Sequence, residues 1–399
     1  MKNRIAKRML SLAPSLTLAI SAKAKAMKAA GESVVSFGVG EPDFNTPEHI
    51  INAAKAALDA GHTKYTPSSG LLPLRKAICE KFKKDNGLSF EPSQIIVSNG
   101  AKHSIFNACY AVLEEGDEVI IPAPYWLTYP EVVKVCGATP VYIDCKKENK
   151  FKFTAEDLKA AITPKTKMLI FNSPSNPTGA VYSEEEVRAI AKVCEDEEIF
   201  VLADEIYEKL CYNGVKAFSI AKCSDKMKEL TITINGVSKT YAMTGWRVGY
   251  LAAPADIAKA IDSFQSHATS NASSISQYAT IEALLSSDEE IGAMVNVFDK
   301  RREKLLKLAS KIDGVQAVEP DGAFYVMLVV GGLYGKTYNG KTVSNSIEFA
   351  DVLLEAEKVA TVPGVSFGAD DCVRLSYALG EADLKEGLKR IKRFVENLK

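Results

Sequence analysis

The sequence predicts an α/β protein of two domains, built around a largely parallel β-sheet. The chain has 399 residues, which is too long for one compact core and favours two domains. Short apolar runs alternate with helical patterns through the middle of the chain, as in repeated β-then-α units. These runs are almost continuously apolar, which is typical of strands buried on both faces of a parallel sheet.

Six strand-like runs carry this prediction, at residues 94–97, 118–121, 139–143, 167–171, 199–202 and 230–234. Helical patterns lie between them. The clearest spans 183–197, where Ser183 followed by Glu186 makes a capping box. We therefore expect helices to cover the sheet.

The last hundred residues follow a different pattern. A long, highly charged helix pattern spans 295–312, and an apolar run at 323–329, a glycine-rich turn and two more helix patterns follow it. This change predicts a domain boundary near residue 295. We expect a large domain of residues 46–295 and a smaller α+β domain that combines residues 1–45 with 296–399.

The composition favours a small-molecule partner. A formal net charge of −1 gives no electrostatic footprint for nucleic acid or an anionic membrane. The eight cysteines form no C-x-x-C pair and are too sparse for a disulfide framework, so we expect a reducing compartment. The four histidines show no metal-ligand spacing, and we expect no metal.

The N-terminus imitates a secretory signal, because basic residues precede an apolar stretch. Ser11, Pro14, Ser15 and Thr17 interrupt that stretch, and a charged helix-like run follows. No segment reaches the roughly 18 consecutive apolar residues of a membrane span. We therefore expect an uncleaved, cytoplasmic protein.

Polar residues and glycines gather directly after the predicted strands. Such loops stand at 98–102, 124–126, 172–179, 204–207 and 235–239. In an open parallel sheet, ligands bind beyond the carboxyl ends of the strands. Five consecutive loops rich in functional groups therefore predict a binding site at this edge of the sheet.

Lys239 and Arg247 stand out in these loops. A lysine that forms a Schiff base must lose its proton near neutral pH, which requires a desolvated or cation-flanked position. Lys239 follows an apolar strand, and Arg247, whose planar guanidinium suits a phosphate, comes eight positions later. A single lysine is usually a solvated charge, but this context favours a reactive one.

Asp204 ends an apolar strand, where a buried carboxylate needs a positive partner. A protonated pyridine nitrogen would be such a partner, and Tyr207 could present its hydroxyl to the same ring. The alternative is that Asp204 and Glu205 are the N-terminal acids of a helix.

Three further candidates also have ordinary alternatives. Residues 99–102 open a helix pattern and could bind an anion through free backbone amides, but they form no P-loop motif. Trp126 could stack on a planar cofactor or simply fill the core. Arg374 lies among apolar residues, where it needs a carboxylate from the protein or from a substrate.

These motifs together resemble the fold-type I pyridoxal 5′-phosphate (PLP) enzymes, specifically the class I aminotransferases, and most of all bacterial aspartate aminotransferases of the branch called Ib. The resemblance covers essentially the whole chain. It implies a PLP-binding large domain with a mostly parallel seven-stranded sheet, and ping-pong transfer of an amino group, with aspartate the expected donor and 2-oxoglutarate the acceptor. Its markers are Gly40-Glu-Pro-Asp-Phe44, Lys64-Tyr65, Pro124-Tyr-Trp126, Ser173-Pro-Ser-Asn-Pro-Thr-Gly179, Asp204-Glu-Ile-Tyr207, Ser238-Lys239 with Thr244-Gly-Trp-Arg247, and Arg374-Leu-Ser-Tyr377.

The resemblance also implies residue roles at the cofactor. Lys239 would hold PLP covalently and then move the proton between the α-carbon of the amino acid and the cofactor. Asp204 would pair with the ring nitrogen, Trp126 would lie over the ring, and Tyr207 and Asn176 would bind the ring hydroxyl oxygen. The phosphate would be surrounded by Gly100, Ala101, Lys102, Ser238 and Arg247.

Two further roles concern the substrate and the partner subunit. Tyr65 would reach the phosphate of the neighbouring subunit, which implies a homodimer with shared active sites. The α-carboxylate of the substrate would be bound by Arg374, Asn176, Trp126 and Gly40.

The chain departs from the family pattern in two places. Gly236 stands where relatives often have a serine, which puts one hydroxyl for the phosphate in doubt. The animal-type aspartate enzymes bind the second substrate carboxylate with an arginine, and segment 267–277 contains none. In the Ib branch a lysine and N-terminal hydroxyls are thought to replace it, and Lys102, Ser15 and Thr17 occupy those positions.

Other functions remain open at this point. A PLP-dependent lyase or decarboxylase would use the same Lys239 and Asp204, and an aromatic, branched-chain or prephenate aminotransferase would share the whole site. A non-catalytic PLP-binding regulator normally carries a DNA-binding domain, for which there is no room before residue 40. A nicotinamide dehydrogenase is disfavoured because no G-x-G-x-x-G follows a strand.

Overall fold

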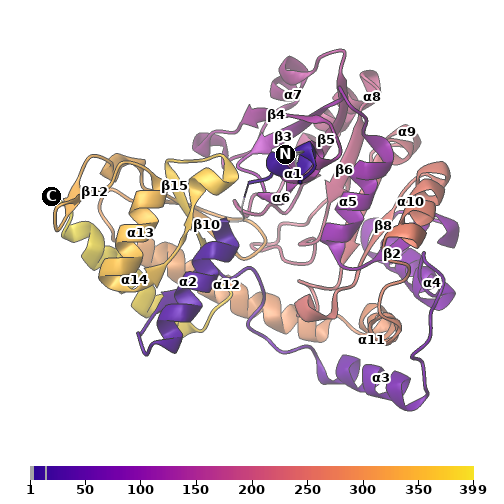
Figure 1. Cartoon of the computed structure of the whole chain (residues 1–399), viewed down its shortest axis with the longest axis horizontal. Helices are drawn as coiled ribbons and strands as arrows, with labels where there is room; N and C mark the ends of the chain where they lie inside the picture. Colours follow the sequence, from indigo (N-terminus) through magenta and orange to yellow (C-terminus); the bar gives the residue numbers. More distant parts are fainter. Residues whose placement is uncertain (1–3, 14–15) are drawn as a thin grey trace.

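The computed structural model describes residues 4–13 and 16–399. Figure 1 shows a larger part built on a seven-stranded sheet and a smaller part built on a four-stranded sheet. The long helix α12 (Glu289–Ala309) extends between the two parts. The predicted α/β architecture is therefore present.

The large sheet has the strand order β2-β8-β7-β6-β5-β3-β4. Its strands from β7 to β4 pair in parallel, and β8 runs antiparallel to both of its neighbours. The six predicted runs all form strands of this sheet, while β8 was not predicted. The strands are β2 (Ile95–Ser98), β3 (Glu118–Ala123), β4 (Thr139–Asp144), β5 (Thr166–Asn172), β6 (Phe200–Asp204), β7 (Thr231–Gly236) and β8 (Gly249–Ala252).

Helices cover both faces of this sheet, because successive strand residues point to opposite sides. In β5, Met168 and Ile170 pack in one core with residues of α5, α6 and α10. Leu169 and Phe171 pack in the other with residues of α7, α8 and α9. The bounds are α5 (Ala101–Val112), α6 (Thr128–Val135), α7 (Ala155–Ala161), α8 (Glu184–Asp196), α9 (Asp225–Glu229) and α10 (Ala255–Ala268).

The predicted capping box starts α8. The Ser183 hydroxyl accepts a hydrogen bond from the Glu186 amide at 3.3 Å, and the Glu186 carboxylate accepts one from the Ser183 amide at 2.7 Å. The two bonds satisfy amides that a helix start leaves unpaired. The helix can then bury Val187 and Ile190 against the sheet.

A third core lies at the far end of the large sheet. It joins β2 and β8 to three helices, α3 (Glu48–Asp59), α4 (Leu72–Lys81) and α11 (Ser274–Leu285). Two glutamine side chains with no solvent exposure hold the loop between α3 and α4. Gln277 donates to the Thr66 hydroxyl and accepts from the Leu71 amide, at 3.0 and 2.8 Å, and Gln265 donates to the Ser68 carbonyl at 2.7 Å.

The small sheet is antiparallel, in the order β14-β15-β10-β9. A short parallel pair ties the N-terminal segment to the C-terminal part, with β1 (Val35–Ser36) beside β13 (Val359–Ala360). Residue 295, the predicted boundary, falls inside α12. The other elements are β9 (Gln316–Val318), β10 (Tyr325–Val329), β11 (Thr337–Tyr338), β12 (Lys341–Thr342), β14 (Val362–Pro363), β15 (Cys372–Ser376), α1 (Lys7–Leu10), α2 (Leu16–Ala29), α13 (Ser346–Glu357) and α14 (Glu381–Glu396).

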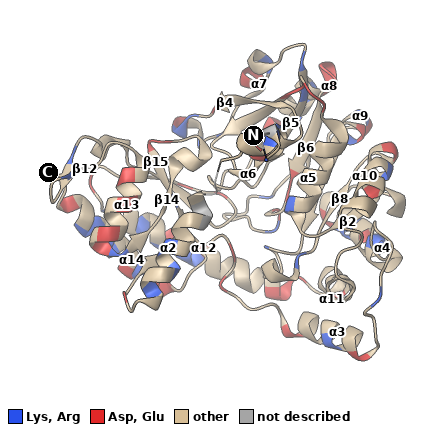
Figure 2. Cartoon of the chain, viewed as in Figure 1, with Lys and Arg blue, Asp and Glu red and all other residues tan. Residues whose placement is uncertain are grey.

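Charged side chains of both signs are spread over both parts in Figure 2, which agrees with the small net charge. Among residues 4–13 and 16–399, no helix combines the length and apolar character that a membrane span requires.

Candidate active site

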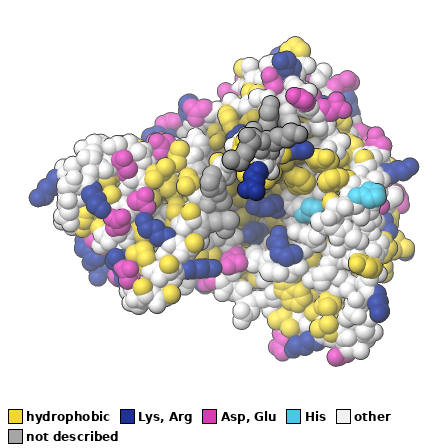
Figure 3. Space-filling view, viewed as in Figure 1, with side chains coloured by type: hydrophobic (Ala, Val, Ile, Leu, Met, Phe, Trp, Pro, Cys, Tyr) yellow, Lys and Arg dark blue, Asp and Glu magenta, His cyan; other side chains and the backbone are white. Residues whose placement is uncertain are grey.

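A cavity of about 320 Å³ lies where the carboxyl ends of β5, β6 and β7 face the small sheet. In Figure 3 the blue side chains of Lys and Arg gather in the hollow at the middle of the face shown. Eleven of the predicted site residues line this cavity. They are Gly40, Ala101, Lys102, Trp126, Asn176, Asp204, Tyr207, Ser238, Lys239, Arg247 and Arg374.

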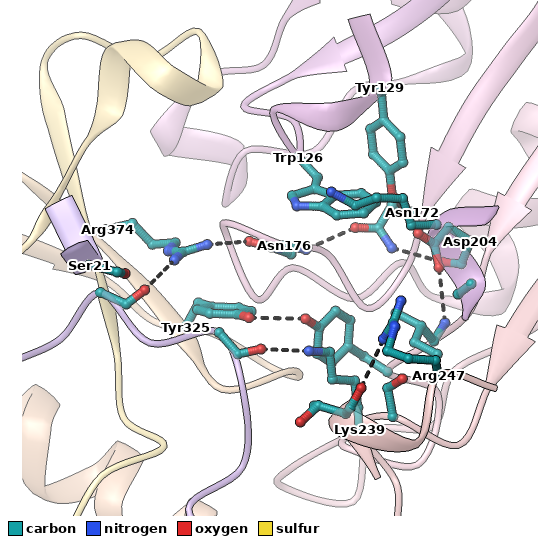
Figure 4. A pocket seen from close by; sticks show the side chains of 18 residues that line it. Ser21, Trp126, Tyr129, Asn172, Asn176, Asp204, Lys239, Arg247, Tyr325 and Arg374 are labelled. Carbon is teal, nitrogen blue, oxygen red and sulfur yellow. Dashed lines mark hydrogen bonds between the residues drawn. The ribbon is translucent and has the colours of Figure 1, made fainter. Parts of the chain in front are cut away.

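Lys239 lies in the turn after β7, with its ammonium in the cavity (Figure 4). Its Nζ donates to the Gly40 carbonyl at 2.5 Å, and it forms no ion pair with a carboxylate among the described residues. Burial lowers the pKa of Lys239 to about 8, Glu41 opposes this shift, and the nearby Arg374 and Arg247 add to it. The site therefore lets Lys239 lose its proton far more easily than an ordinary lysine, with the neutral amine becoming the main form above about pH 8.

Asp204 ends β6 and is 3% exposed. One carboxylate oxygen accepts from the Tyr129 hydroxyl at 2.7 Å, and the other accepts from the Ile206 amide at 3.2 Å. Burial raises the pKa of Asp204 to about 6, against the effect of these hydrogen bonds. A turn rather than a helix follows β6, so the alternative that Asp204 and Glu205 start a helix is wrong.

Arg247 and the start of α5 form one corner of the cavity. The Arg247 guanidinium donates to the carbonyls of Thr244 and Asn99, at 2.8 and 3.3 Å, and meets no carboxylate among the described residues. Gly100 precedes α5 with φ of 89°, and a Cβ there would lie 2.3 Å from Arg247 Nη2. Glycine therefore lets the guanidinium lie against the free amides of the helix start, as an anion site requires.

Arg374 lies in the middle of β15, as predicted, and is 4% exposed. Its guanidinium donates to Asn176 Oδ1 at 2.9 Å and to the Gly38 carbonyl at 3.3 Å, and it stacks on the Tyr325 ring at 4.4 Å. Its buried Nε has no hydrogen-bond partner among the described residues. A buried cation that lines the cavity and has no carboxylate partner among those residues is suited to a carboxylate ligand.

Aromatic side chains form the remaining walls. The hydroxyls of Tyr207 and Tyr325 lie 3.0 Å apart, and burial raises the pKa of Tyr207 well above its ordinary value, so its hydroxyl keeps its proton. Trp126 presents its ring to the cavity just before α6, and Lys102 Nζ lies over that ring at 4.7 Å.

Two expected residues, Gly100 and Tyr65, do not line the cavity, and two others cannot be placed by their side chains. Gly100 stands behind Arg247. Tyr65 is 91% exposed on the loop held by Gln265 and Gln277, and it does not line the cavity. Ser15 lies outside the described residues, and of Thr17 only the backbone, in α2, is described. A serine at Gly236 would be crowded, because its Cβ would lie 3.0 Å from the Cα of Gly249 on the neighbouring strand.

Seven lining residues were missed. Thr244 stood inside a quoted motif without a role, and Asn172 and Ile206 stood within the predicted loops. Tyr129 follows Trp126 at a helical spacing that only the structure reveals as the start of α6. The full set is Ser21, Gly38, Tyr129, Asn172, Ile206, Thr244 and Tyr325.

Comparison with known proteins decides the family. Residues 32–391 match the family model described as aminotransferase class I and II. The chain belongs to this family. It is an aminotransferase, and not a PLP-dependent lyase, a non-catalytic PLP-binding regulator or a nicotinamide dehydrogenase.

This aminotransferase has full-length relatives. It is 50% identical to the aspartate aminotransferase of Bacillus subtilis (strain 168), over 98% of this chain and 99% of the relative. It is 45% identical to a probable aspartate/prephenate aminotransferase of Aquifex aeolicus (strain VF5), over 100% of both chains.

Solved structures agree with the predicted fold. The crystal structure of the aspartate aminotransferase from Rhizobium meliloti superposes on this aminotransferase with a TM-score of 0.96, at 43% identity over 100% of both chains. The Thermus thermophilus aspartate aminotransferase with maleate gives 0.92, at 40% identity over 99% of this chain and 100% of that one. The fold-type I prediction is confirmed.

Proposed function

We propose that the chain uses PLP to transfer the amino group of aspartate to 2-oxoglutarate in two half-reactions. One observation carries the proposal. The cavity brings together Lys239, Asp204 and Arg247, and none of the three has an oppositely charged partner among the described residues. A buried or half-buried charge without an oppositely charged partner is energetically costly unless a ligand supplies that partner.

The residues fit PLP group by group. Asp204 suits a protonated ring nitrogen, Arg247 with Gly100 and Ala101 suits a phosphate, and the neutral amine of Lys239 suits an aldehyde. Trp126 offers an aromatic plane for the ring. When bound, the cofactor supplies an electron-accepting ring that stabilises the charge left at the α-carbon when its proton leaves.

Each of these side chains has its own proposed role in the reaction. Lys239 would hold the cofactor and would move the α-proton as a base whose pKa is lowered to about 8 by burial. Asp204 would keep the ring nitrogen protonated, and the Tyr129 hydroxyl, which donates to its carboxylate, would fix it in place. Tyr207, whose hydroxyl lies 3.0 Å from that of Tyr325, would bind the ring hydroxyl oxygen together with Asn176.

Arg374 would bind the substrate α-carboxylate with its guanidinium, and Asn176, Trp126 and Gly40 would complete that end of the cavity. Aspartate is the proposed donor because relatives at 43–50% identity carry that name. Lys102 is the proposed cation for the second carboxylate. Ser15 and Thr17 remain proposed helpers from the N-terminal segment.

A homodimer is proposed from Tyr65. Its loop is held by buried glutamines, yet the tyrosine ring itself is exposed. A loop held by buried side chains that exposes an aromatic ring suits a contact with a second copy, where Tyr65 would meet the partner's phosphate.

Two further assignments remain proposals. The division into residues 46–295 and 1–45 with 296–399 is supported by the pairing of β1 with β13, although α12 crosses the boundary. A cytoplasmic location is supported by the eight cysteines, all of which are free thiols.

Two measurements test the function. Purified protein with aspartate and 2-oxoglutarate should release oxaloacetate, and borohydride should fix the cofactor to Lys239. A label on another lysine would overturn the assignment of the site. The second candidate donor–acceptor pair involves prephenate, because relatives at 44–46% identity are named for both substrates. Comparing kcat/KM for 2-oxoglutarate and prephenate as acceptors separates the two.

A further inference from the structure

The ammonium of Lys102 is held on one side of the cavity. Lys102 Nζ donates to the Thr128 hydroxyl at 3.0 Å and lies over the Trp126 ring at 4.7 Å. It forms no ion pair with a carboxylate among the described residues. Arg247, the other cation nearby, is instead fixed by the carbonyls of Thr244 and Asn99. The two cations are therefore anchored separately.

The Thr128 hydroxyl has no evident task in the fold. Thr128 is the first residue of α6 and is 8% exposed, but its side chain does not cap that helix. Lys102 is the one hydrogen-bond partner that the described residues offer to this hydroxyl. Loss of the hydroxyl would thus release the lysine without removing a bond that α6 needs.

Holding a lysine in advance affects what it can bind. A lysine side chain has many rotamers, and fixing one of them on binding opposes affinity. Thr128 and Trp126 come from one short segment whose next residue, Tyr129, holds Asp204. This segment therefore sets the position of Lys102 relative to the carboxylate that faces the ring nitrogen.

We propose that Thr128 is a positioning residue for substrate selectivity, and that its hydroxyl holds Lys102 where the second carboxylate of a dicarboxylic substrate binds. The proposal rests on the role given to Lys102 in the proposed function. Thr128 acts only through Lys102, so its effect must be confined to substrates with that second carboxylate.

The test compares Thr128→Val with Thr128→Ser. Valine keeps the shape of the buried side chain and removes the hydroxyl, whereas serine keeps the hydroxyl. With valine, kcat/KM for aspartate should fall about tenfold, while kcat/KM for alanine should change by less than about twofold. Serine should leave both values near those of the parent protein. Equal losses for aspartate and alanine, or equal losses with valine and serine, would overturn the proposal.

Binding without turnover gives a second measurement. The affinity of the PLP-loaded protein for succinate should fall about tenfold with Thr128→Val, and the affinity for butyrate, which lacks the second carboxylate, should not change. Thermal unfolding of the parent and both variants checks that the fold is intact. Unchanged succinate affinity in folded Thr128→Val would contradict the proposal.

The Lys102→Ala variant distinguishes a failure of the positioning role proposed for Thr128 from a failure of the substrate role proposed for Lys102. If Lys102→Ala lowers aspartate and alanine turnover equally, the substrate role of Lys102 is wrong and the proposal falls with it. If Lys102→Ala is selective for aspartate and Thr128→Val has no effect, only the positioning role is wrong. If both hold, Thr128→Val should add no further loss in the Lys102→Ala background, because the two residues act as one unit.

Discussion

Arg302 in α12 and Arg374 in β15 are both almost fully buried, with 2% and 4% of their surface exposed, yet their surroundings differ. Arg302 donates to Asp299 and Glu319, each at 2.8 Å, and to Asn213 at 3.0 Å. Among the described residues, the only hydrogen-bond acceptors of Arg374 are an amide oxygen and a carbonyl, and its Nε has no partner there.

The pKa directions follow from these surroundings. Burial lowers the pKa of Arg302, but its hydrogen bonds with Asp299 and Glu319 outweigh burial and raise it overall. Burial lowers the pKa of Arg374, and no carboxylate reverses this. Two arginines of similar burial can thus be distinguished by their partners. The arginine paired with carboxylates stabilises the fold, and the unpaired arginine is available to bind a ligand.

Buried lysines and acids show the same contrast. Lys81 forms a buried ion pair with Glu208, which also accepts from Asn86 at 2.7 Å and Asn235 at 2.8 Å. Lys239 and Asp204 lie in the cavity without such partners. Changes to the unpaired group should therefore affect catalysis, and changes to the paired group should affect stability.

The largest effect is expected for Arg374→Leu. The substrate α-carboxylate would lose its cation, so kcat/KM should fall by about 10²–10⁴-fold. Removal of an unpaired buried charge should leave the midpoint of thermal unfolding unchanged or higher. Steady-state kinetics and calorimetry measure the two quantities, and a large drop in the unfolding midpoint would break the comparison.

Asp204→Asn comes next. Asparagine cannot keep the ring nitrogen protonated, so kcat should fall by about 10²–10³-fold, the range for losing one oriented electrostatic contact. The dissociation constant of PLP, measured by equilibrium dialysis, should rise much less. A near-parental kcat would show that the ring nitrogen does not depend on Asp204.

Arg302→Leu is the matched change on the paired side. Asp299 and Glu319 would lose their cation but remain partly solvated, so the free energy of unfolding should fall by about 2 kcal/mol. Denaturant unfolding measures it. The kcat/KM for aspartate should stay within about twofold of the parent value, and a larger loss would place Arg302 in the catalytic machinery.

The smallest effect concerns pH. Because the pKa of Lys239 is lowered to about 8, its reactive neutral amine increases as pH rises through that value. The rate at which cofactor-free protein recovers bound PLP should therefore reach half of its maximum near pH 8. A rate that still climbs steeply at about pH 10, as for an ordinary lysine, would show that the site does not lower this pKa.

The sequence predicted most of the large sheet because its strands are buried on both faces and are therefore apolar throughout. Strand β8 was missed because Gly249-Tyr-Leu-Ala252 is short and begins with glycine. The structure explains that glycine, since a Cβ there would lie 2.1 Å from the Ala101 amide. Close approach to another segment leaves no periodic signal in the strand itself.

The site was predictable wherever a polar residue directly follows a strand, as at Asp204 and Lys239. Tyr325 was not, because it lies inside an apolar strand and reaches the cavity only through the packing of the small sheet against the large one. The orphaned Nε of Arg374 and the anchoring of Lys102 by Thr128 are also properties of tertiary contact. No pattern within one segment encodes them.

The cavity brings together residues that lie far apart in the sequence, and this separation affects the order in which the site can form during synthesis. The Arg374 bond to Asn176 joins residues 198 positions apart, and the Lys239 bond to Gly40 joins residues 199 apart. Contacts of such long sequence separation form late in folding, after local helices and neighbouring strands. During synthesis, every group proposed to face the cofactor leaves the ribosome before Arg374 does. The nascent chain can therefore assemble the residues proposed to bind the cofactor first. Arg374, which is proposed to bind the substrate α-carboxylate, is added only later.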